Sequence, residues 1–192
     1  MREIIVSKEE IESICERIAG ELKERFKDSK NVPVFIGVLK GAMPFMIDLV
    51  KHCDFELEED FIQVSSYDGT ASTGVIHLKK DVSSDIKNRD VVIIEDIIDT
   101  GLTLSYLKQY LKIKYQPASI TLCTLIDKKP LRKVELEADL VGVTLKENKF
   151  LVGYGLDYYE LARNIDYVFT PSKEDLKKWD KIIKDEKESL KD

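Results

Sequence analysis

The chain has 192 residues, with 30 basic and 36 acidic side chains and a formal net charge of −6 at pH 7. This balance argues against a protein that binds nucleic acid or an anionic membrane surface, because both partners attract a basic face. Since 43% of the residues are hydrophobic and 34% are charged, disordered and low-complexity classes are excluded as well. The length predicts a single domain over residues 1–192.

The cysteines and the N-terminal residues indicate where the protein works. Cys15, Cys53 and Cys123 are far apart, odd in number and set in apolar segments, which argues against a disulfide framework or a structural zinc site. The N-terminal residues are acidic and lack the basic head and apolar core of a signal peptide. No run approaches the roughly 18 apolar residues of a membrane span. The sequence therefore predicts a cytoplasmic protein without a membrane partner.

Helical spacing of apolar residues predicts four helices along the chain. Ser7 and Glu10 form a capping-box pair in front of the first of them. The predicted helices are residues 8–27, residues 42–53 with Pro44 in the first turn, a helix through Leu104, Leu107 and Leu111, and a C-terminal helix from Ser172. For the C-terminal helix, which is rich in Lys and Glu, we expect packing or a subunit contact.

Short runs rich in β-branched residues predict the strands that alternate with these helices. The predicted strands are residues 32–39, 61–66, 75–79, 91–95, 119–126, 139–145 and 150–155. Alternation of this kind implies right-handed crossovers and a mostly parallel sheet flanked by helices, which is an α/β fold. Residues 67–74 (YDGTASTG) are small and polar without periodicity, which predicts a long mobile loop at the tip of a hairpin.

Ligands of open α/β sheets bind beyond the carboxyl ends of the strands, and the run VVIIEDIIDTGLTL stands at such an end. Glu95, Asp96 and Asp99 precede a Thr-Gly-Leu-Thr turn into a helix. Backbone N–H groups and hydroxyls at a helix N-terminus suit a monophosphate, and adjacent carboxylates suit Mg²⁺ or a sugar diol. A solvated loop with a capping Asp is the ordinary alternative. Walker and GxGxxG spacings are absent, which argues against kinase-like and dinucleotide sites.

Three further places after predicted strands carry charged, glycine or aromatic residues. They are Leu39-Lys40-Gly41, the charged loop 127–132, and residues 149–157 followed by Arg163. Taken singly, each has an ordinary explanation as a solvated loop, and Phe150 as a core side chain.

Taken in this order, the four places resemble the type I phosphoribosyltransferases, specifically the hypoxanthine-guanine phosphoribosyltransferases. The similarity runs from about residue 33 to residue 169. EDIIDTGLTL is similar to the family's phosphoribosyl pyrophosphate motif, and FLVGYGLDYYELARNIDYV to its more specific purine-site signature. The resemblance implies a Rossmann-like sheet with a small hood of chain-terminal segments and a flexible hairpin loop. It also implies a purine salvage reaction, in which Mg²⁺-dependent transfer of the 5-phosphoribosyl group to N9 of hypoxanthine or guanine gives IMP or GMP and pyrophosphate.

The resemblance further implies which residues bind the two substrates. For phosphoribosyl pyrophosphate they are Leu39, Lys40, Gly41, Glu95, Asp96, Asp99, Thr100, Gly101, Leu102, Thr103, Asp157 and Arg163. For the purine they are Lys128, Lys149, Phe150 and Leu151, and for the flexible loop Ser66 and Tyr67. The metal ligands implied are Glu95, Asp96 and Asp157.

Individual roles also follow from the resemblance. Glu95 and Asp96 accept hydrogen bonds from the ribose hydroxyls, and Asp99 takes a proton from N7 of the base as a general base. Lys128, with donors and no acceptor, reads the 6-oxo group and rejects adenine, although the adjacent Lys129 is an alternative. Phe150 stacks on the base, and a cis peptide bond precedes Lys40. Leu102 stands where several family members carry a polar or basic residue.

Competing hypotheses remain at this point. An enzyme that prefers xanthine and guanine is a close variant, whereas a phosphoribosyl pyrophosphate-responsive RNA-binding regulator and a non-catalytic phosphate-binding module belong to other classes. We expect a homodimer or homotetramer. The sequence leaves open the preference among hypoxanthine, guanine and xanthine, and the order of binding.

Overall fold

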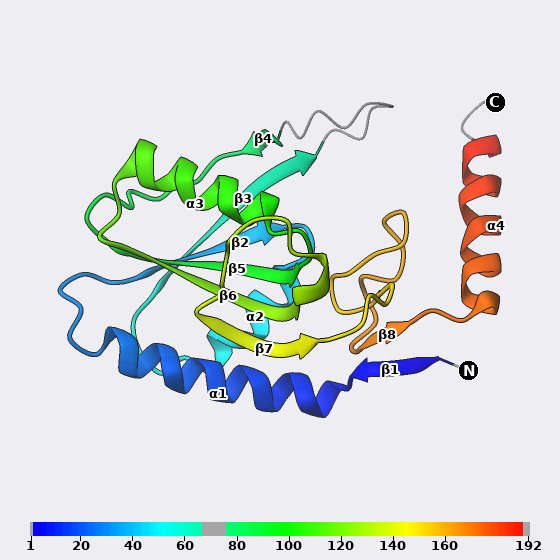
Figure 1. Ribbon diagram of the computed structural model, residues 1–192, viewed down its shortest axis with the longest axis horizontal. Coiled ribbons are helices and arrows are strands. Elements are labelled where there is room, and N and C mark those ends of the chain that lie inside the picture. The colour runs from blue at the N-terminus through cyan, green and yellow to red at the C-terminus, as the bar shows by residue number, and fades with distance from the viewer. Residues whose placement is uncertain (1, 67–75, 190–192) are drawn as a thin grey trace.

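The computed structural model describes residues 2–66 and 76–189 and shows a central sheet flanked by helices (Figure 1). Its elements in chain order are β1 (Glu3–Val6), α1 (Lys8–Phe26), β2 (Val34–Leu39), α2 (Met43–Lys51), β3 (Glu58–Ser66), β4 (Ile76–Lys80), β5 (Asp90–Ile98), α3 (Leu102–Tyr115), β6 (Ser119–Lys128), the 3₁₀ helix η1 (Lys129–Leu131), β7 (Leu140–Leu145), β8 (Val168–Thr170) and α4 (Lys173–Ser189). Among the described residues, no helix has the length and apolar character needed to cross a bilayer.

The central sheet has six strands in the order β4-β3-β2-β5-β6-β7. All neighbours pair in parallel except β3 and β4, which form an antiparallel pair. Alternate residues of β5 face the two helical layers, as the period of two along a strand requires. Val92 and Ile94 pack in the cluster with α1 and α2, whereas Val91 and Ile93 pack in the cluster with α3. The predicted α/β fold with a mostly parallel sheet is therefore confirmed.

The capping box at the first helix forms as the sequence predicts. The Glu10 backbone N–H donates to Ser7 Oγ at 3.2 Å, and the Ser7 backbone N–H donates to Glu10 Oε2 at 2.7 Å. Both groups are donors that the helix itself leaves unsatisfied. The second helix is also confirmed, with Pro44 in its first turn.

Three predicted strands differ from the structure by three residues or in kind. β3 begins at Glu58 and not at residue 61, because it pairs with β2 from Val34 and Glu58 onward. β5 reaches Ile98 and not residue 95, because it stays paired with β6 as far as Ile98 and Asp127. Residues 150–155 form no regular strand and make only isolated bridges, such as the one between Val152 and Phe169. The physical reason is the backbone at Gly153, Tyr154 and Gly155, where φ is 94°, 49° and 94°; such angles fold the chain into a tight turn.

The two ends of the chain build a hood beside the main sheet, as expected. β1 and β8, which the sequence did not predict as strands, pair antiparallel, and α4 follows β8 at the edge of the molecule (Figure 1). The bridge between Val152 and Phe169 joins the turn at 152–155 to the same hood. The predicted loop 67–74 lies outside the described residues.

One carboxylate fixes the start of α4 to the N-terminal strand. Arg2 donates to both Asp175 oxygens at 2.8 to 3.2 Å, and its guanidinium lies 4.5 Å from the centre of the Phe169 ring. Ser172 and Asp175 also complete a capping box at the helix N-terminus. The Arg2 guanidinium holds the pKa of Asp175 well below its ordinary value of 3.8.

Replacing Asp175 by Ala should therefore lower the free energy of unfolding by about 1–2 kcal/mol, because a cap and charge-assisted hydrogen bonds are lost together. The folded-state pKa is depressed, so this contribution is present above pH 4 or so and is lost as the pH falls through and below the ordinary value. Urea denaturation at pH 7 and pH 3 measures both effects. Asp185→Ala, an exposed acid on the same helix, is the matched control, and equal losses in the two variants would contradict the argument.

Candidate active site

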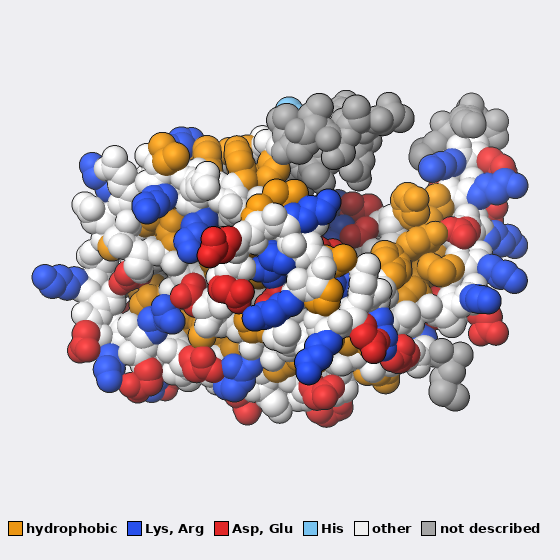
Figure 2. Space-filling view, in the orientation of Figure 1, with side chains coloured by type: hydrophobic (Ala, Val, Ile, Leu, Met, Phe, Trp, Pro, Cys, Tyr) orange, Lys and Arg blue, Asp and Glu red, His pale blue; other side chains and the backbone are white. Residues whose placement is uncertain are grey.

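A cavity of about 280 Å³ lies at the carboxyl ends of β2 and β5 and at the start of α3. Six of the predicted site residues line it, namely Leu39, Glu95, Asp99, Thr100, Gly101 and Thr103. This is the edge of the sheet at which parallel folds bind their ligands. Acidic side chains lie in the hollow between the main body and the hood (Figure 2).

The two carboxylates at the end of β5 are buried. Glu95 is 8% exposed and Asp96 is 7% exposed, and they lie within the strand because β5 continues to Ile98. Burial raises the pKa of both groups, and at Glu95 the negative charge of Asp96 adds to the effect. Such a pair favours a proton, a cation or hydroxyl donors between its oxygens.

Two glycines allow separate loops to meet beside Asp96. A Cβ on Gly41 would lie 1.8 Å from Asp96 Oδ2, and a Cβ on Gly155 would lie 1.9 Å from the Gly41 carbonyl oxygen. Any larger residue at either position would push the loops apart. The loop after β2, the end of β5 and the turn at 153–155 are thus packed into one site.

The turn between β5 and α3 has a backbone geometry that suits the predicted phosphate cradle. Gly101 precedes the helix with φ at +79°, a conformation that favours glycine. The first helical N–H groups follow from Leu102, whose side chain is 43% exposed. Thr100 is fixed by its carbonyl oxygen, which accepts from Lys133 N–H at 2.9 Å. Backbone donors at a helix N-terminus suit an anion.

An acid that the sequence reasoning missed joins the two cations expected at the pyrophosphate site. Glu160 Oε2 accepts from Lys40 Nζ at 2.9 Å and from Arg163 Nη2 at 3.4 Å. The peptide bond before Lys40 is cis, as the resemblance implies. Arg163 also pairs with Asp157 at 2.9 Å and donates to the Gly155 carbonyl at 2.6 Å. The two cations therefore already converge on a carboxylate.

Lys128 and Asp99 form an ion pair beside the cradle. Lys128 is only 5% exposed, and its Nζ lies 3.4 Å from Asp99 Oδ1, whose side chain is half exposed. Lys129 is exposed and pairs with Glu137 at 3.2 Å. The structure thus brings Lys128, and not Lys129, to the predicted general base.

Arg132, to which the sequence assigned no role, supports this pair through the backbone of Asp99. It pairs with the buried Asp127, and its Nε donates to the Asp99 carbonyl at 3.3 Å. A Cβ on Gly101 would lie 2.8 Å from Arg132 Cδ. The charged loop 127–132, ordinary by composition, thus holds the turn at 99–101 in place.

The purine-side residues are brought together only in part. Phe150 is 52% exposed and meets the Tyr158 ring edge-on with centroids 6.0 Å apart, while Leu151 beside it is buried. The Lys149 ammonium instead pairs with Glu3 and Glu147, outside the contacts that join the other predicted residues. Ser66 ends β3, and Tyr67 lies outside the described residues.

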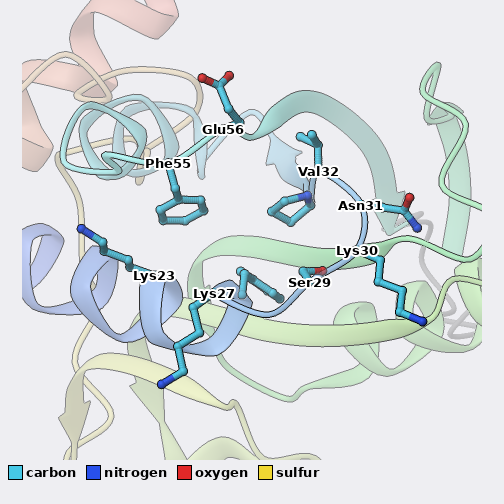
Figure 3. Close-up of a pocket in the computed structure, with 10 residues that line it drawn as sticks. Lys23, Lys27, Ser29, Lys30, Asn31, Val32, Phe55 and Glu56 are labelled. Atoms are coloured by element: carbon cyan, nitrogen blue, oxygen red, sulfur yellow. The ribbon is translucent and has the colours of Figure 1, made fainter.

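A second cavity, of about 360 Å³, lies between the end of α1 and the segments before β2 and β3. Figure 3 shows that the ammonium groups of Lys23, Lys27 and Lys30 point to different sides of it. Lys23 and Lys27 are paired with Asp54 and Glu24. This cavity faces the opposite edge of the sheet from the acidic pair and contains none of the predicted site residues.

The proposed metal ligands form no closed cage. Within the described part of the chain, only Glu12, Glu16 and His52 bring three ligand atoms within 4.8 Å of one another, and they are far in sequence from the cradle. Glu95, Asp96 and Asp157 nevertheless offer the carboxylate oxygens that Mg²⁺ takes when substrate phosphates complete its shell. The donor set therefore fits a Mg²⁺ ion that arrives with a phosphorylated substrate.

Comparisons with known proteins agree with this geometry. Residues 1–159 match the family model of the phosphoribosyl transferase domain. The chain is 47% identical to the hypoxanthine-guanine phosphoribosyltransferase of Streptococcus pneumoniae over 88% of this chain and 92% of that protein, and 45% identical to that of Bacillus subtilis over the same shares. Among solved structures, a hypoxanthine phosphoribosyltransferase from Staphylococcus aureus matches with a TM-score of 0.83 and 42% identity, covering 90% of this chain and 92% of that one. The Trypanosoma cruzi enzyme in complex with its product IMP matches with a TM-score of 0.81 and 32% identity, covering 90% and 95%.

Proposed function

Because the chain belongs to the phosphoribosyltransferase family, we propose that it is a purine salvage enzyme of the hypoxanthine-guanine type. It transfers the 5-phosphoribosyl group of phosphoribosyl pyrophosphate to N9 of hypoxanthine or guanine, which gives IMP or GMP and releases pyrophosphate. The observation that carries the proposal is the buried Lys128 paired with Asp99 beside the cradle at 99–103. This arrangement supports Lys128 as a base reader next to a phosphate site.

The sugar and its phosphates bind at the loops that meet beside Asp96. The backbone N–H groups and hydroxyls of residues 99–103 hold the 5′-phosphate, and Glu95 and Asp96 accept from the ribose hydroxyls. Asp157, Glu95 and Asp96 are the residues that hold Mg²⁺, which supplies positive charge against the negative charge that grows on the leaving pyrophosphate. Lys40 and Arg163 bind the pyrophosphate oxygens, and for this they leave Glu160.

The purine binds between Lys128 and the exposed ring of Phe150. Lys128 donates to the 6-oxo group. Because an ammonium carries no acceptor, it cannot accept a hydrogen bond from the 6-amino group of adenine, and adenine is rejected. Phe150 stacks on the base, and main-chain groups of Leu151 read its other edge. Asp99 takes the N7 proton while N9 attacks C1 of the sugar.

The test of this function is nucleotide formation from phosphoribosyl pyrophosphate and Mg²⁺. Hypoxanthine, guanine, xanthine and adenine are offered separately, and the product is identified by chromatography. We expect IMP and GMP and no AMP. If no oxopurine is turned over, the enzyme assignment is overturned. If xanthine is the preferred base, the protein is instead an enzyme of the xanthine-guanine type.

Replacing Lys128 by Ala should relax the discrimination at the 6-position. The loss of a buried cationic donor to the 6-oxo group should raise KM for hypoxanthine about tenfold or more, while adenine is no longer repelled. Steady-state kinetics with both bases measures the ratio of kcat/KM. Lys129→Ala is the matched control, because the Lys129 ammonium is exposed and pairs with Glu137. A larger effect in this variant would assign the base reader to Lys129.

Two expectations extend the proposal beyond the site. We propose a homodimer or homotetramer, which light scattering of the purified protein tests, and a cytoplasmic location. The oligomer is supported by the resemblance to the family. The cytoplasmic location is supported by that resemblance and by the cysteine pattern of the sequence.

A further inference from the structure

The C-terminal helix α4 lies beyond the part of the chain that carries the family resemblance, which ends near residue 169. The helix stands at the edge of the molecule beside the hood (Figure 1). Most of its side chains are exposed, but Trp179 is only 7% exposed and joins a cluster with Val152, Ala162 and Phe169. α4 is therefore docked on the hood through one face.

The contact between α4 and the hood centres on Tyr158. The rings of Tyr158 and Trp179 are 5.8 Å apart, and the Tyr158 hydroxyl donates to Asp180 Oδ1 at 2.7 Å. Two consecutive residues of α4 thus fix this side chain, one at its ring and one at its hydroxyl. A hydrogen bond at the far end of a packed ring restrains its rotation as well as its position.

Tyr158 also contacts Phe150, the ring proposed as the purine platform. The exposed Phe150 ring meets it edge-on, with centroids 6.0 Å apart and an interplanar angle of 80°. An exposed phenyl ring has freedom about its side-chain bonds, and binding a base flat against it costs that freedom. A neighbouring ring at the T-shaped distance reduces the cost by holding the platform in one orientation.

Tyr158 also closes the loop that carries the pyrophosphate-side residues. The Tyr158 N–H donates to the Leu161 carbonyl, and the Leu161 N–H donates to the Tyr158 carbonyl, both at 3.0 Å. Asp157 precedes it, and Glu160 lies inside the closed loop. A displacement of the Tyr158 side chain would therefore act on the rings in contact with it, that of Phe150 among them, while the main chain of the loop is kept by its own hydrogen bonds.

We propose that α4 is a built-in support of the purine site, in which Trp179 and Asp180 position Tyr158 and Tyr158 in turn positions Phe150. These three are positioning residues, since none of them touches the reacting atoms. The inference rests on the proposed function, because it takes Phe150 as the surface on which the oxopurine stacks. It assigns to α4 a role in base affinity.

A double-mutant cycle between Tyr158→Phe and Asp180→Ala tests the support. Each change removes one end of the same hydrogen bond, so each should raise KM for hypoxanthine about two- to fivefold. kcat and KM for phosphoribosyl pyrophosphate should stay within about 1.5-fold. The double variant should be no worse than the worse single variant, because both changes delete one interaction. Tyr158→Leu, which removes the ring, should raise KM for hypoxanthine further.

The matched control is Asp185→Ala, an exposed acid further along α4, which should leave every kinetic constant unchanged. Equal effects of Asp180→Ala and Asp185→Ala, an additive double variant, or a parallel rise of KM for both substrates would overturn the inference. If the unaltered protein forms no nucleotide, the proposed function itself fails. If it turns over normally and the Tyr158 and Asp180 variants behave like it, only the role of α4 fails.

A spectroscopic readout tests the same support without turnover. Trp179 is the single tryptophan of the chain and packs against Tyr158. Its fluorescence emission therefore reports on the contact between α4 and Tyr158. Titration with IMP should change the emission of the unaltered protein, and the response should be smaller in Tyr158→Leu at saturating IMP. An unchanged emission while equilibrium dialysis shows IMP bound would count against the connection between α4 and the base.

Discussion

Replacing Asp99 by Asn should lower kcat for nucleotide formation about 100-fold and leave KM for phosphoribosyl pyrophosphate within about threefold. The amide keeps the shape of the side chain but does not take a proton at neutral pH, and loss of a general base typically costs at least this factor. In the proposed binding mode, the contacts of the turn with the sugar phosphate come from backbone groups. The position of the turn depends on Arg132, which donates to the Asp99 carbonyl, and Asp99→Asn leaves that carbonyl in place. Steady-state kinetics with hypoxanthine as the varied substrate separates the two constants.

The substrate supplies the control for this variant. A more acidic oxopurine loses its proton to water more easily, so it depends less on the enzyme's base and should be slowed less by Asp99→Asn. Equal slowing of both bases would indicate that Asp99 acts on binding geometry. An unchanged kcat would remove the general-base role altogether. In the free protein, Asp99 is held by Lys128 at 3.4 Å, and the same lysine would face the 6-oxo group once the base is bound.

The fold was predictable where one strand carries its own signal. The run from Val91 to Ile94 is apolar on both faces because helices cover both sides of the sheet, so it is recognisable without knowledge of its neighbours. β1 and β8 have four and three residues and pair the two ends of the chain, a contact that no local pattern reveals. The turn at 153–155 has an apolar sequence but positive φ angles, and apolar content alone indicated a strand.

The candidate site was likewise predictable only where its residues are neighbours in the sequence. The cradle at 99–103 is local, and its spacing was visible in the sequence as a turn into a helix. The role of Glu160 is not local, since it depends on Lys40, which lies 120 residues earlier in the chain. Arg132 likewise looked like one charge of a solvated loop until the fold placed it on Asp99 and Asp127. Charged residues in loops have no periodicity, so only the structure distinguishes a solvated one from one that holds a site together.

Replacing Glu95 by Gln should make the free protein more stable and a poorer enzyme. Glu95 and Asp96 are adjacent and buried, so the unliganded protein bears the cost of desolvating two carboxylates and of their mutual repulsion. The neutral, isosteric amide removes one of those charges, and the melting temperature should rise by about 3–6 °C. In the proposed binding mode, the same change removes a charged acceptor from the ribose hydroxyls and the metal, so KM for phosphoribosyl pyrophosphate should rise about tenfold or more.

Differential scanning calorimetry with and without phosphoribosyl pyrophosphate and Mg²⁺ measures the stability of the free protein and its stabilisation by the ligands. The ligands should raise the melting temperature of the unaltered protein more than that of Glu95→Gln, because binding relieves a repulsion that the variant no longer has. Glu135→Gln, an exposed acid, is the matched control and should change neither value. If the variant is less stable than the unaltered protein, the Glu95 charge is already compensated in the free protein. A proton bound between the two carboxyl groups would then stabilise the unliganded site.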